Sequence, residues 1–147
     1  MRALASSFAL LMFGLGSAMA EPKVEATQVV EAWARAFNAS DVDGIVALYA
    51  PDALFVGTGS KTVVNSPEGI RRYFEEALLS NRPRGAKLDD SSTMVLSETA
   101  VLVTGLDTVT GVRDGQPYSA SGRATFVVAK RGPDWKIVHF HRSAMPR

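Results

Sequence analysis

The second half of the chain contains four long β-type runs in succession, and this arrangement limits the possible folds more than any other feature. The runs begin at Lys87 and are rich in valine, threonine and aromatic residues: TMVLS, AVLVTGLDTVTG, YSASGRATFVVAK and DWKIVHFHRSA. Turn-forming residues separate them at 97–99, 113–117 and 131–134. Four consecutive strands joined by such turns predict an antiparallel meander.

The first half of the chain predicts three helices and one short strand. VEATQVVEAWARAFN carries apolar residues at the spacing of an amphipathic helix, which should end at 38–40. A short second helix is expected over 44–50, followed by the strand ALFVG. The third helix begins with Ser66 as N-cap and Pro67 in its first turn, and it should end before 83–85. The chain therefore places its helices before its meander.

Helices followed by strands are typical of an α+β domain. We predict about three N-terminal helices packed on one face of a curved, mainly antiparallel sheet. Residues 21–147 are enough for a single domain with a substantial core. Because the chain has no cysteine, packing alone must hold this fold, and thiol nucleophiles and thiolate metal sites are excluded.

Residues 1–20 have the features of a secretory signal peptide. Arg2 precedes an apolar stretch, and Ala18-Met19-Ala20 is a small-x-small cleavage site. A transmembrane anchor is the alternative, but the apolar run is shorter than the roughly 18 residues that a membrane-spanning helix needs. We therefore expect cleavage after Ala20 and a periplasmic or secreted protein.

The charge of the chain excludes some classes of partner. The sequence has 16 Lys and Arg against 15 Asp and Glu, and removal of Arg2 with the signal peptide leaves 15 of each. A neutral chain without runs of basic residues lacks the electrostatic surface that binds phosphate backbones, so no nucleic-acid partner is expected. It also lacks the basic amphipathic helix of a membrane-surface protein, so no membrane partner is expected.

The closing segment RGPDWKIVHFHRSAMP is similar to the end of the association (hub) domain of calcium/calmodulin-dependent protein kinase II. The pattern GRATF…WKIVHFHRS, together with LYAPDALF, resembles bacterial SnoaL-like proteins. The order of elements also resembles the nuclear transport factor 2-like cone. These motifs cover about thirty residues, whereas the order of elements covers nearly all of the chain after residue 20.

The resemblance implies two kinds of function. The hub domain assembles rings of subunits and has an arginine-lined cleft that takes small carboxylates, which implies a homo-oligomer binding a small apolar or carboxylate molecule without a cofactor. Kinase activity is not expected, because the sequence has no glycine-rich phosphate loop with VAIK, no HRD and no DFG. Other relatives are isomerases, cyclases or dehydratases, so an enzyme of the SnoaL or ketosteroid-isomerase type is the alternative.

Arg142 is the principal candidate for ligand binding. It matches by position an arginine of the hub cleft, and strand alternation places it with Phe140 on the face that points into the cone. A guanidinium on an apolar wall needs a partner, and a ligand carboxylate could engage it with two hydrogen bonds. An internal salt bridge to Asp52 or Asp107 is the alternative.

The resemblance is weaker at a second arginine of the hub cleft. An ungapped comparison places Phe126 there, so the cavity is expected to be more apolar than that of the hub. Arg123 lies three residues away, which on a regular strand is the opposite face. A β-bulge could bring it back to the cavity.

The other face of the last strand is a candidate subunit interface. Regular alternation places Trp135, Ile137, His139 and His141 together on it. A second apolar face implies a second covered surface, and a copy of the same chain is the simplest cover. The two histidines could instead share a zinc ion with a third ligand, but no HExxH motif or carboxylate trio accompanies them, and no metal site is predicted.

Four residues are candidates for acid–base chemistry under the enzyme alternative. Asp107 or Asp52 could act as general base, because a carboxylate in an apolar cavity can have a raised pKa. Tyr49 or Tyr73 could donate a hydrogen bond to a developing oxyanion. Asp52 follows Pro51 and could equally be a turn residue, and Asp107 could face solvent.

Overall fold

The structure is a computed structural model that describes residues 21–146. The predicted signal peptide lies outside these residues. The elements follow one another in the order α1 (Pro22–Asn38), α2 (Val42–Val46), β1 (Tyr49–Val56), α3 (Pro67–Leu79), β2 (Gly85–Ser97), β3 (Ala100–Arg113), β4 (Gln116–Arg131) and β5 (Asp134–Ala144). The predicted order of helices and strands is therefore confirmed. No helix among the described residues has the length and apolar character needed to cross a bilayer.

The helices begin where local side chains satisfy their free backbone N–H groups. Ser66 accepts a hydrogen bond from the backbone of Gly69 at the start of α3, and Pro67 occupies the first turn, as predicted. Asp41 accepts one from Gly44 at the start of α2. The prediction of a helix over 44–50 was wrong at its end, because Tyr49 already begins β1 and pairs with β5.

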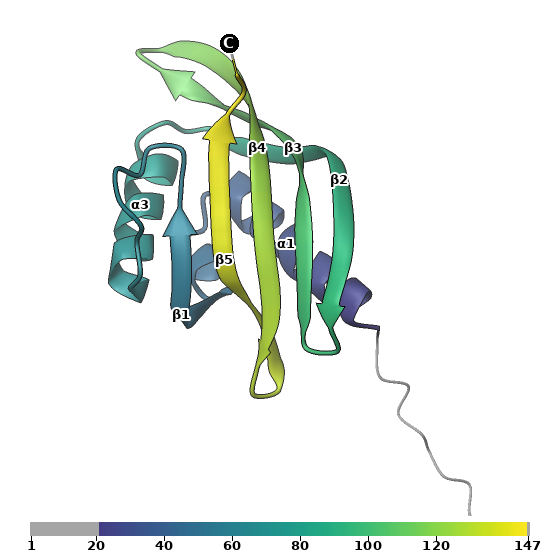
Figure 1. The fold of residues 1–147 in the computed structure, drawn as a ribbon. Helices are drawn as coiled ribbons and strands as arrows, with labels where there is room; N and C mark the ends of the chain where they lie inside the picture. Colours follow the sequence, from purple (N-terminus) through teal and green to yellow (C-terminus); the bar gives the residue numbers. More distant parts are fainter. Residues whose placement is uncertain (1–20, 147) are drawn as a thin grey trace, which may run out of the picture.

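The five strands form one mixed sheet in the order β1-β5-β4-β3-β2. The meander from β2 to β5 is antiparallel, as predicted, and β1 joins its edge parallel to β5. Figure 1 shows α1 crossing behind the sheet and α3 standing beside β1, while the far end of the β3–β4 hairpin bends over the top of the fold. One face of the sheet is thus covered by helices.

The core lies between α1, α3 and the covered face of the sheet. Its centre is a group of aromatic rings from both layers: Trp33, Phe55, Phe74, Phe126 and Phe140. The ring centroids of Trp33 and Phe140 are 5.3 Å apart in a stacked arrangement, and those of Trp33 and Phe126 are 5.3 Å apart edge to face. These contacts join α1 to the centre of the sheet.

A β-bulge in β5 overturns the predicted alternation of the last strand. Val128 pairs with Ile137 while Val127 pairs with His139, so Val138 is an extra residue in the ladder. The inserted residue reverses the side on which the preceding residues lie. Ile137 is fully buried in the core with Phe140, whereas His139 is not.

The predicted interface is therefore wrong for two of its four members. Ile137 has no exposed surface, and Trp135 packs against the core near Val29 and Leu48, on the helix side of the sheet. His139 and His141 remain on the uncovered face, where their backbone partners on β1 are Leu54 and Val56. Regular alternation failed here because one extra residue shifts the pattern by one position.

Candidate functional site

A cavity of about 290 Å³ lies at the open end of the cone. It is bounded by α1, by the segment after β1, by α3, by the segment before β2 and by the bent end of the β3–β4 hairpin, with β5 as its floor. The residues that line it are Trp33, Phe37, Thr58, Gly59, Tyr73, Phe74, Ala77, Arg84, Val109, Arg113, Tyr118, Ala120, Phe140 and Arg142. The set combines aromatic walls with three arginines, and it contains no acidic side chain.

The apolar side of the cavity is an extension of the core. Trp33 is held in place by a hydrogen bond of 2.9 Å from its indole Nε1 to the hydroxyl of Tyr49. Its ring stacks on Phe140 and meets Phe74 edge to face, with centroids 6.3 Å apart. These rings are preorganised by packing, so an apolar ligand would meet a surface that is already ordered.

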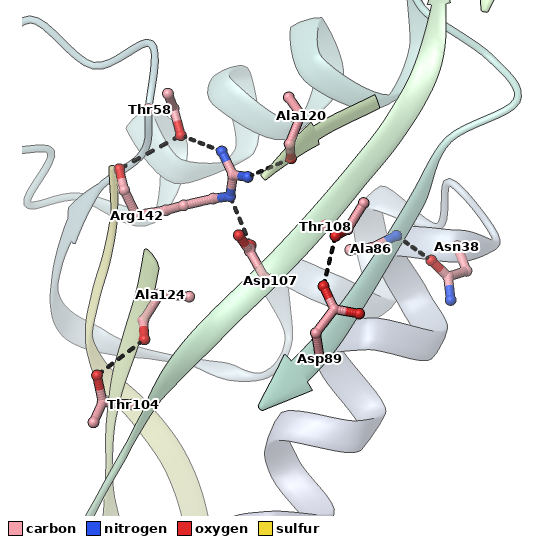
Figure 2. A network of polar contacts seen from close by, with 10 residues as sticks. All are labelled: Asn38, Thr58, Ala86, Asp89, Thr104, Asp107, Thr108, Ala120, Ala124 and Arg142. Carbon is pink, nitrogen blue, oxygen red and sulfur yellow. Dashed lines mark hydrogen bonds and ion pairs between the residues drawn. The ribbon is translucent and has the colours of Figure 1, made fainter. Parts of the chain in front are cut away.

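Arg142 enters the cavity from β5, but its guanidinium is already engaged within the protein. Its Nε donates to Asp107 at 2.6 Å, Nη1 donates to the hydroxyl of Thr58 at 2.8 Å, and Nη2 donates to the carbonyl of Ala120 at 3.1 Å. Figure 2 shows this guanidinium between the three acceptors. The internal salt bridge, one of the two alternatives left open for Arg142, is therefore present, and its carboxylate is Asp107.

Gly122 makes room for this pair. Gly122 lies opposite Asp107 in the β3–β4 ladder. A Cβ atom there would lie 2.4 Å from Nη2 of Arg142 and 2.7 Å from Oδ1 of Asp107, well inside van der Waals contact. The side chain of Asp107 is only 3% exposed, and that of Arg142 is 11% exposed. The pair is thus a buried element of the fold, and its Arg142 also lines the cavity.

Arg84 forms the opposite wall. Its guanidinium lies 5.3 Å from the ring centroid of Phe37 and 5.6 Å from that of Tyr118, and Nη1 donates to the Tyr118 hydroxyl. Burial lowers the pKa of Arg84 from its ordinary value, and repulsion by Arg113 and Arg142 lowers it further. Within the described residues, Arg84 has no carboxylate partner.

Arg113 stands at the exposed mouth of the cavity. Its guanidinium lies 4.9 Å from the ring centroid of Tyr118, and no carboxylate among residues 21–146 forms a salt bridge with it. Two of the three arginines therefore carry uncompensated charge. Because Asp107 neutralises only Arg142, the cavity as a whole is positive and suited to an anion.

Two of the predicted acid–base residues lie away from the cavity. Asp52 is exposed and accepts hydrogen bonds of 2.8 and 3.1 Å from Arg131, which hold its pKa below the usual value. Tyr49 is enclosed in the core, where burial raises its pKa well above the usual value. Neither lines the cavity, so their predicted roles in catalysis find no support in its geometry.

The other two acid–base candidates lie in or next to the cavity. Tyr73 lines the cavity, as its candidate role requires, and burial raises its pKa. Asp107 is buried rather than facing solvent, yet it contacts Arg142 and does not line the cavity. A general base would therefore have to act from outside the space that a ligand can occupy.

Of the four predicted ligand-binding residues, two line the cavity and two do not. Phe140 and Arg142 line the cavity, but Phe126 lies behind them with no exposed surface. The β3–β4 ladder runs without a bulge from its start to its end, so Arg123 stays on the uncovered face of the sheet beside Leu106. The predictions for Phe126 and Arg123 as cavity residues were wrong.

Sequence reasoning missed the residues that complete the cavity, above all Arg84 and Tyr118. Arg82 and Arg84 flank Pro83 in the same way, and nothing in the sequence distinguishes the exposed arginine from the one under the hairpin. Arg113 and Tyr118 border the predicted turn at 113–117, and nothing in their local sequence marks them as cavity residues. One signal was available: Arg84 lies just before β2, and Arg113 and Tyr118 lie at the β3–β4 turn, so all three lie at the same end of the cone.

The positions of the histidines and carboxylates can be compared with the requirements of a metal site. No group of three or more His, Asp or Glu side chains within residues 21–146 is arranged to hold a metal ion. His139 and His141 lie on the uncovered face, away from the cavity.

Comparison with known proteins places this geometry in a family. The profile of the SnoaL-like domain matches residues 26–147. No curated protein matches the chain. A structure from Xanthomonas campestris, named for a calcium/calmodulin-dependent protein kinase II association domain, is 29% identical, with a TM-score of 0.77 over 84% of this chain and 87% of that one.

Two further structures share the fold at lower identity. A nuclear transport factor 2-like superfamily protein from Salmonella enterica serovar Typhimurium is 22% identical, with a TM-score of 0.76 over 85% of this chain and 92% of that one. A ketosteroid isomerase-like protein from Erwinia carotovora is 15% identical, with a TM-score of 0.73 over 88% and 100% of the two chains. The predicted cone is thus confirmed.

Proposed function

This chain belongs to the SnoaL-like domain family, and we propose that it is an exported, homo-oligomeric protein whose cone binds a small molecule with an apolar body and an acidic group. One observation carries the ligand assignment: the cavity is walled by aromatic rings and three arginines, and none of its lining residues is acidic. Export rests on the sequence of residues 1–20 alone.

The walls of the cavity support both parts of the proposed ligand. Trp33, Phe74 and Phe140 offer ordered apolar surface, which favours burial of an apolar body. Arg84 and Arg113 offer positive charge that no carboxylate of the described residues neutralises. A neutral apolar ligand would leave that charge unpaired, so a carboxylate satisfies the cavity better.

Binding is better supported than catalysis. A SnoaL or ketosteroid-isomerase type enzyme needs a general base within reach of its substrate, and Asp52 and Asp107 both lie outside the lining of the cavity. Tyr73 is the one candidate of the four that lines it. A tyrosine whose pKa is raised by burial is a hydrogen-bond donor rather than a base near neutral pH.

The ligand proposal is tested by filling the cavity. We expect small apolar carboxylates such as phenylacetate to raise the melting temperature of the protein, because a ligand that binds only the native state stabilises it. Ala77→Trp, which places an indole where Ala77 lines the cavity, should abolish this rise. Leu79→Trp is the matched control, because Leu79 is exposed on the same helix. Equal rises in both variants, or none in the unsubstituted protein, would contradict the proposal.

The uncovered face of the sheet supports the proposed oligomer. One row of residues crosses all five strands and contains no Asp, Glu, Lys or Arg: Leu54, His139, Val127, Leu102 and Met94. Leu54 and Met94 at its two ends are exposed. A nearby row carries Arg123 on β4 and Asp90 on β2, with Leu106 between them.

A second copy of the chain suits this face because the face is self-complementary. A two-fold axis that lies between two stacked sheets, along the strands above Leu106, can bring the Arg123 of one copy against the Asp90 of the other while the apolar row is covered. Neither Arg123 nor Asp90 forms a salt bridge within residues 21–146. We therefore propose a dimer through this face as the simplest form of the oligomer.

Light scattering after size exclusion tests the oligomer. The unsubstituted protein should have at least twice the monomer mass, and Met94→Lys should shift it toward the monomer because a charge is costly in an apolar interface. Val63→Lys changes an equally exposed apolar residue outside the sheet and should leave the mass unchanged. A clean monomer for the unsubstituted protein would refute the proposed interface.

A further inference from the structure

Arg84 differs from the other arginines of the cavity in how its hydrogen bonds are used. Nη1 donates to the hydroxyl of Tyr118, but Nε is shielded from solvent and has no hydrogen-bond partner among the described residues. Nη2 likewise forms no hydrogen bond within residues 21–146. The edge formed by Nε and Nη2 is therefore free, and this is the edge that a carboxylate engages with two parallel hydrogen bonds.

The rest of the Arg84 side chain is held in place. Phe37 and Tyr118 both lie close to its guanidinium, and Gly111 allows the close approach, because a Cβ there would lie 2.6 Å from Nη1. Two rings and one hydrogen bond limit the orientations open to the guanidinium, which lowers the entropy lost when it binds an acceptor. A buried N–H without a partner is costly, so an acceptor at this edge would be stabilising.

Arg142 is less available than Arg84 to bind a ligand carboxylate. Each of its three nitrogen atoms already donates within the protein, to Asp107, Thr58 and the carbonyl of Ala120. Its charge is also balanced by Asp107 at 2.6 Å. A ligand carboxylate at Arg142 would compete with a buried salt bridge, whereas at Arg84 it would meet no competing anion.

The dimensions of the cavity restrict the body of the ligand. Its volume of about 290 Å³ is at the lower limit of small-molecule sites. Its inner wall consists of Trp33, Phe74 and Phe140, whose rings already pack edge to face and stacked. An aromatic ring in the ligand can extend this packing.

Building on the proposed function, we propose that Arg84 binds the carboxylate of a small aromatic monocarboxylic acid through its Nε–Nη2 edge, with the ring against Trp33 and Phe140. Arg113 at the mouth adds long-range attraction, and Tyr118 fixes the orientation of the Arg84 guanidinium. For this contact the guanidinium has to turn its Nε–Nη2 edge, whose Nε is shielded from solvent, toward the cavity. Arg142 in this arrangement is a structural wall rather than the anion site.

Calorimetry with a matched pair of probes tests the inference. Phenylacetate and phenylacetamide have the same ring and nearly the same shape, but only the first is an anion. The unsubstituted protein should bind phenylacetate about 10- to 100-fold more tightly, as expected for hydrogen bonds to a charged group. Arg84→Gln should remove this preference by weakening phenylacetate far more than phenylacetamide, and Arg84→Lys should restore only part of it.

Two charge-matched controls distinguish direct contact between Arg84 and the ligand carboxylate from long-range electrostatic attraction. Arg82→Gln removes the same charge two residues away, outside the lining of the cavity, and should leave the preference intact. Arg113→Gln should weaken phenylacetate binding only a few-fold, and high salt should abolish that difference because it acts through solvent. Thermal unfolding of each variant checks that the fold is retained.

The outcomes distinguish the two levels of the proposal. If the unsubstituted protein binds neither probe, the proposed function and this inference both fail. If it binds phenylacetate and Arg84→Gln retains the preference for the anion, the inference about Arg84 fails while ligand binding in the cone stands. If Arg84→Gln weakens both probes equally, Arg84 shapes the cavity and does not bind the carboxylate. If cyclohexylacetate binds as tightly as phenylacetate, the aromatic part of the inference is overturned.

Discussion

Replacement of Asp107 by alanine is expected to lower the free energy of unfolding by about 3–5 kcal/mol, the usual cost of removing one partner of a buried salt bridge. Asp107 is 3% exposed and accepts from Nε of Arg142 at 2.6 Å. Without it, the guanidinium keeps only Thr58 and the carbonyl of Ala120 and has no counter-charge. Urea-induced unfolding, followed by tryptophan fluorescence, measures the change.

Two comparisons show whether this loss comes from the buried charge. Asp52→Ala breaks an exposed salt bridge with Arg131 and should change the stability little. Combining Asp107→Leu with Arg142→Met removes both charges and should recover much of the stability that Asp107→Ala loses, since apolar groups can replace a buried pair. A loss no greater for Asp107→Ala than for Asp52→Ala would show that the pair is not a stabilising element.

Replacement of Phe126 by alanine is expected to lower the free energy of unfolding by about 3–5 kcal/mol, through loss of apolar contacts and creation of a cavity. Phe126 has no exposed surface, and its ring lies 5.3 Å from Trp33 and 4.8 Å from Phe140, centroid to centroid. Because it does not line the cavity, it should matter for stability and not for ligand contact. Urea-induced unfolding measures this effect.

Leucine substitutions separate the two roles, because leucine preserves most of the buried volume. Phe126→Leu should retain the affinity for phenylacetate, whereas Phe140→Leu should weaken it, since Phe140 lines the cavity and Phe126 does not. Calorimetry on both variants gives the comparison. Weakening of the same size in both would mean that the cavity reaches deeper than the structure places it, and that Phe126 contacts the ligand after all.

Helices, strands and their order could be predicted because their signals are local. Ser66 and Pro67 start α3 as their chemistry requires, and turns at 98–99, 114–115 and 132–133 separate the strands of the meander. The second helix lies earlier than expected, at Val42–Val46, because Pro51 does not follow a helix but lies within β1. Proline is tolerated there because β1 is an edge strand.

Which face a residue occupies could be predicted only where the ladder is regular. Arg142 and Phe140 were assigned correctly to the covered side, because no bulge separates them. Ile137 and Trp135 were assigned to the wrong side, because Val138 is an extra residue and neither its chemistry nor its neighbours mark it. A bulge is a property of two paired strands, and the sequence of one strand does not reveal it.

The sequence by itself determined the order of elements, the α+β class and the apolar inner strands, since periodicity, helix caps and turn chemistry act over a few residues. Only the tertiary structure decided which charged groups meet. Arg142 contacts Asp107 across 35 positions, and Arg84 meets Tyr118 across 34, through strand register and the bend of the β3–β4 hairpin. Long-range pairing of this kind depends on the whole fold, and so does the difference between an arginine already neutralised and one that is free to bind an anion.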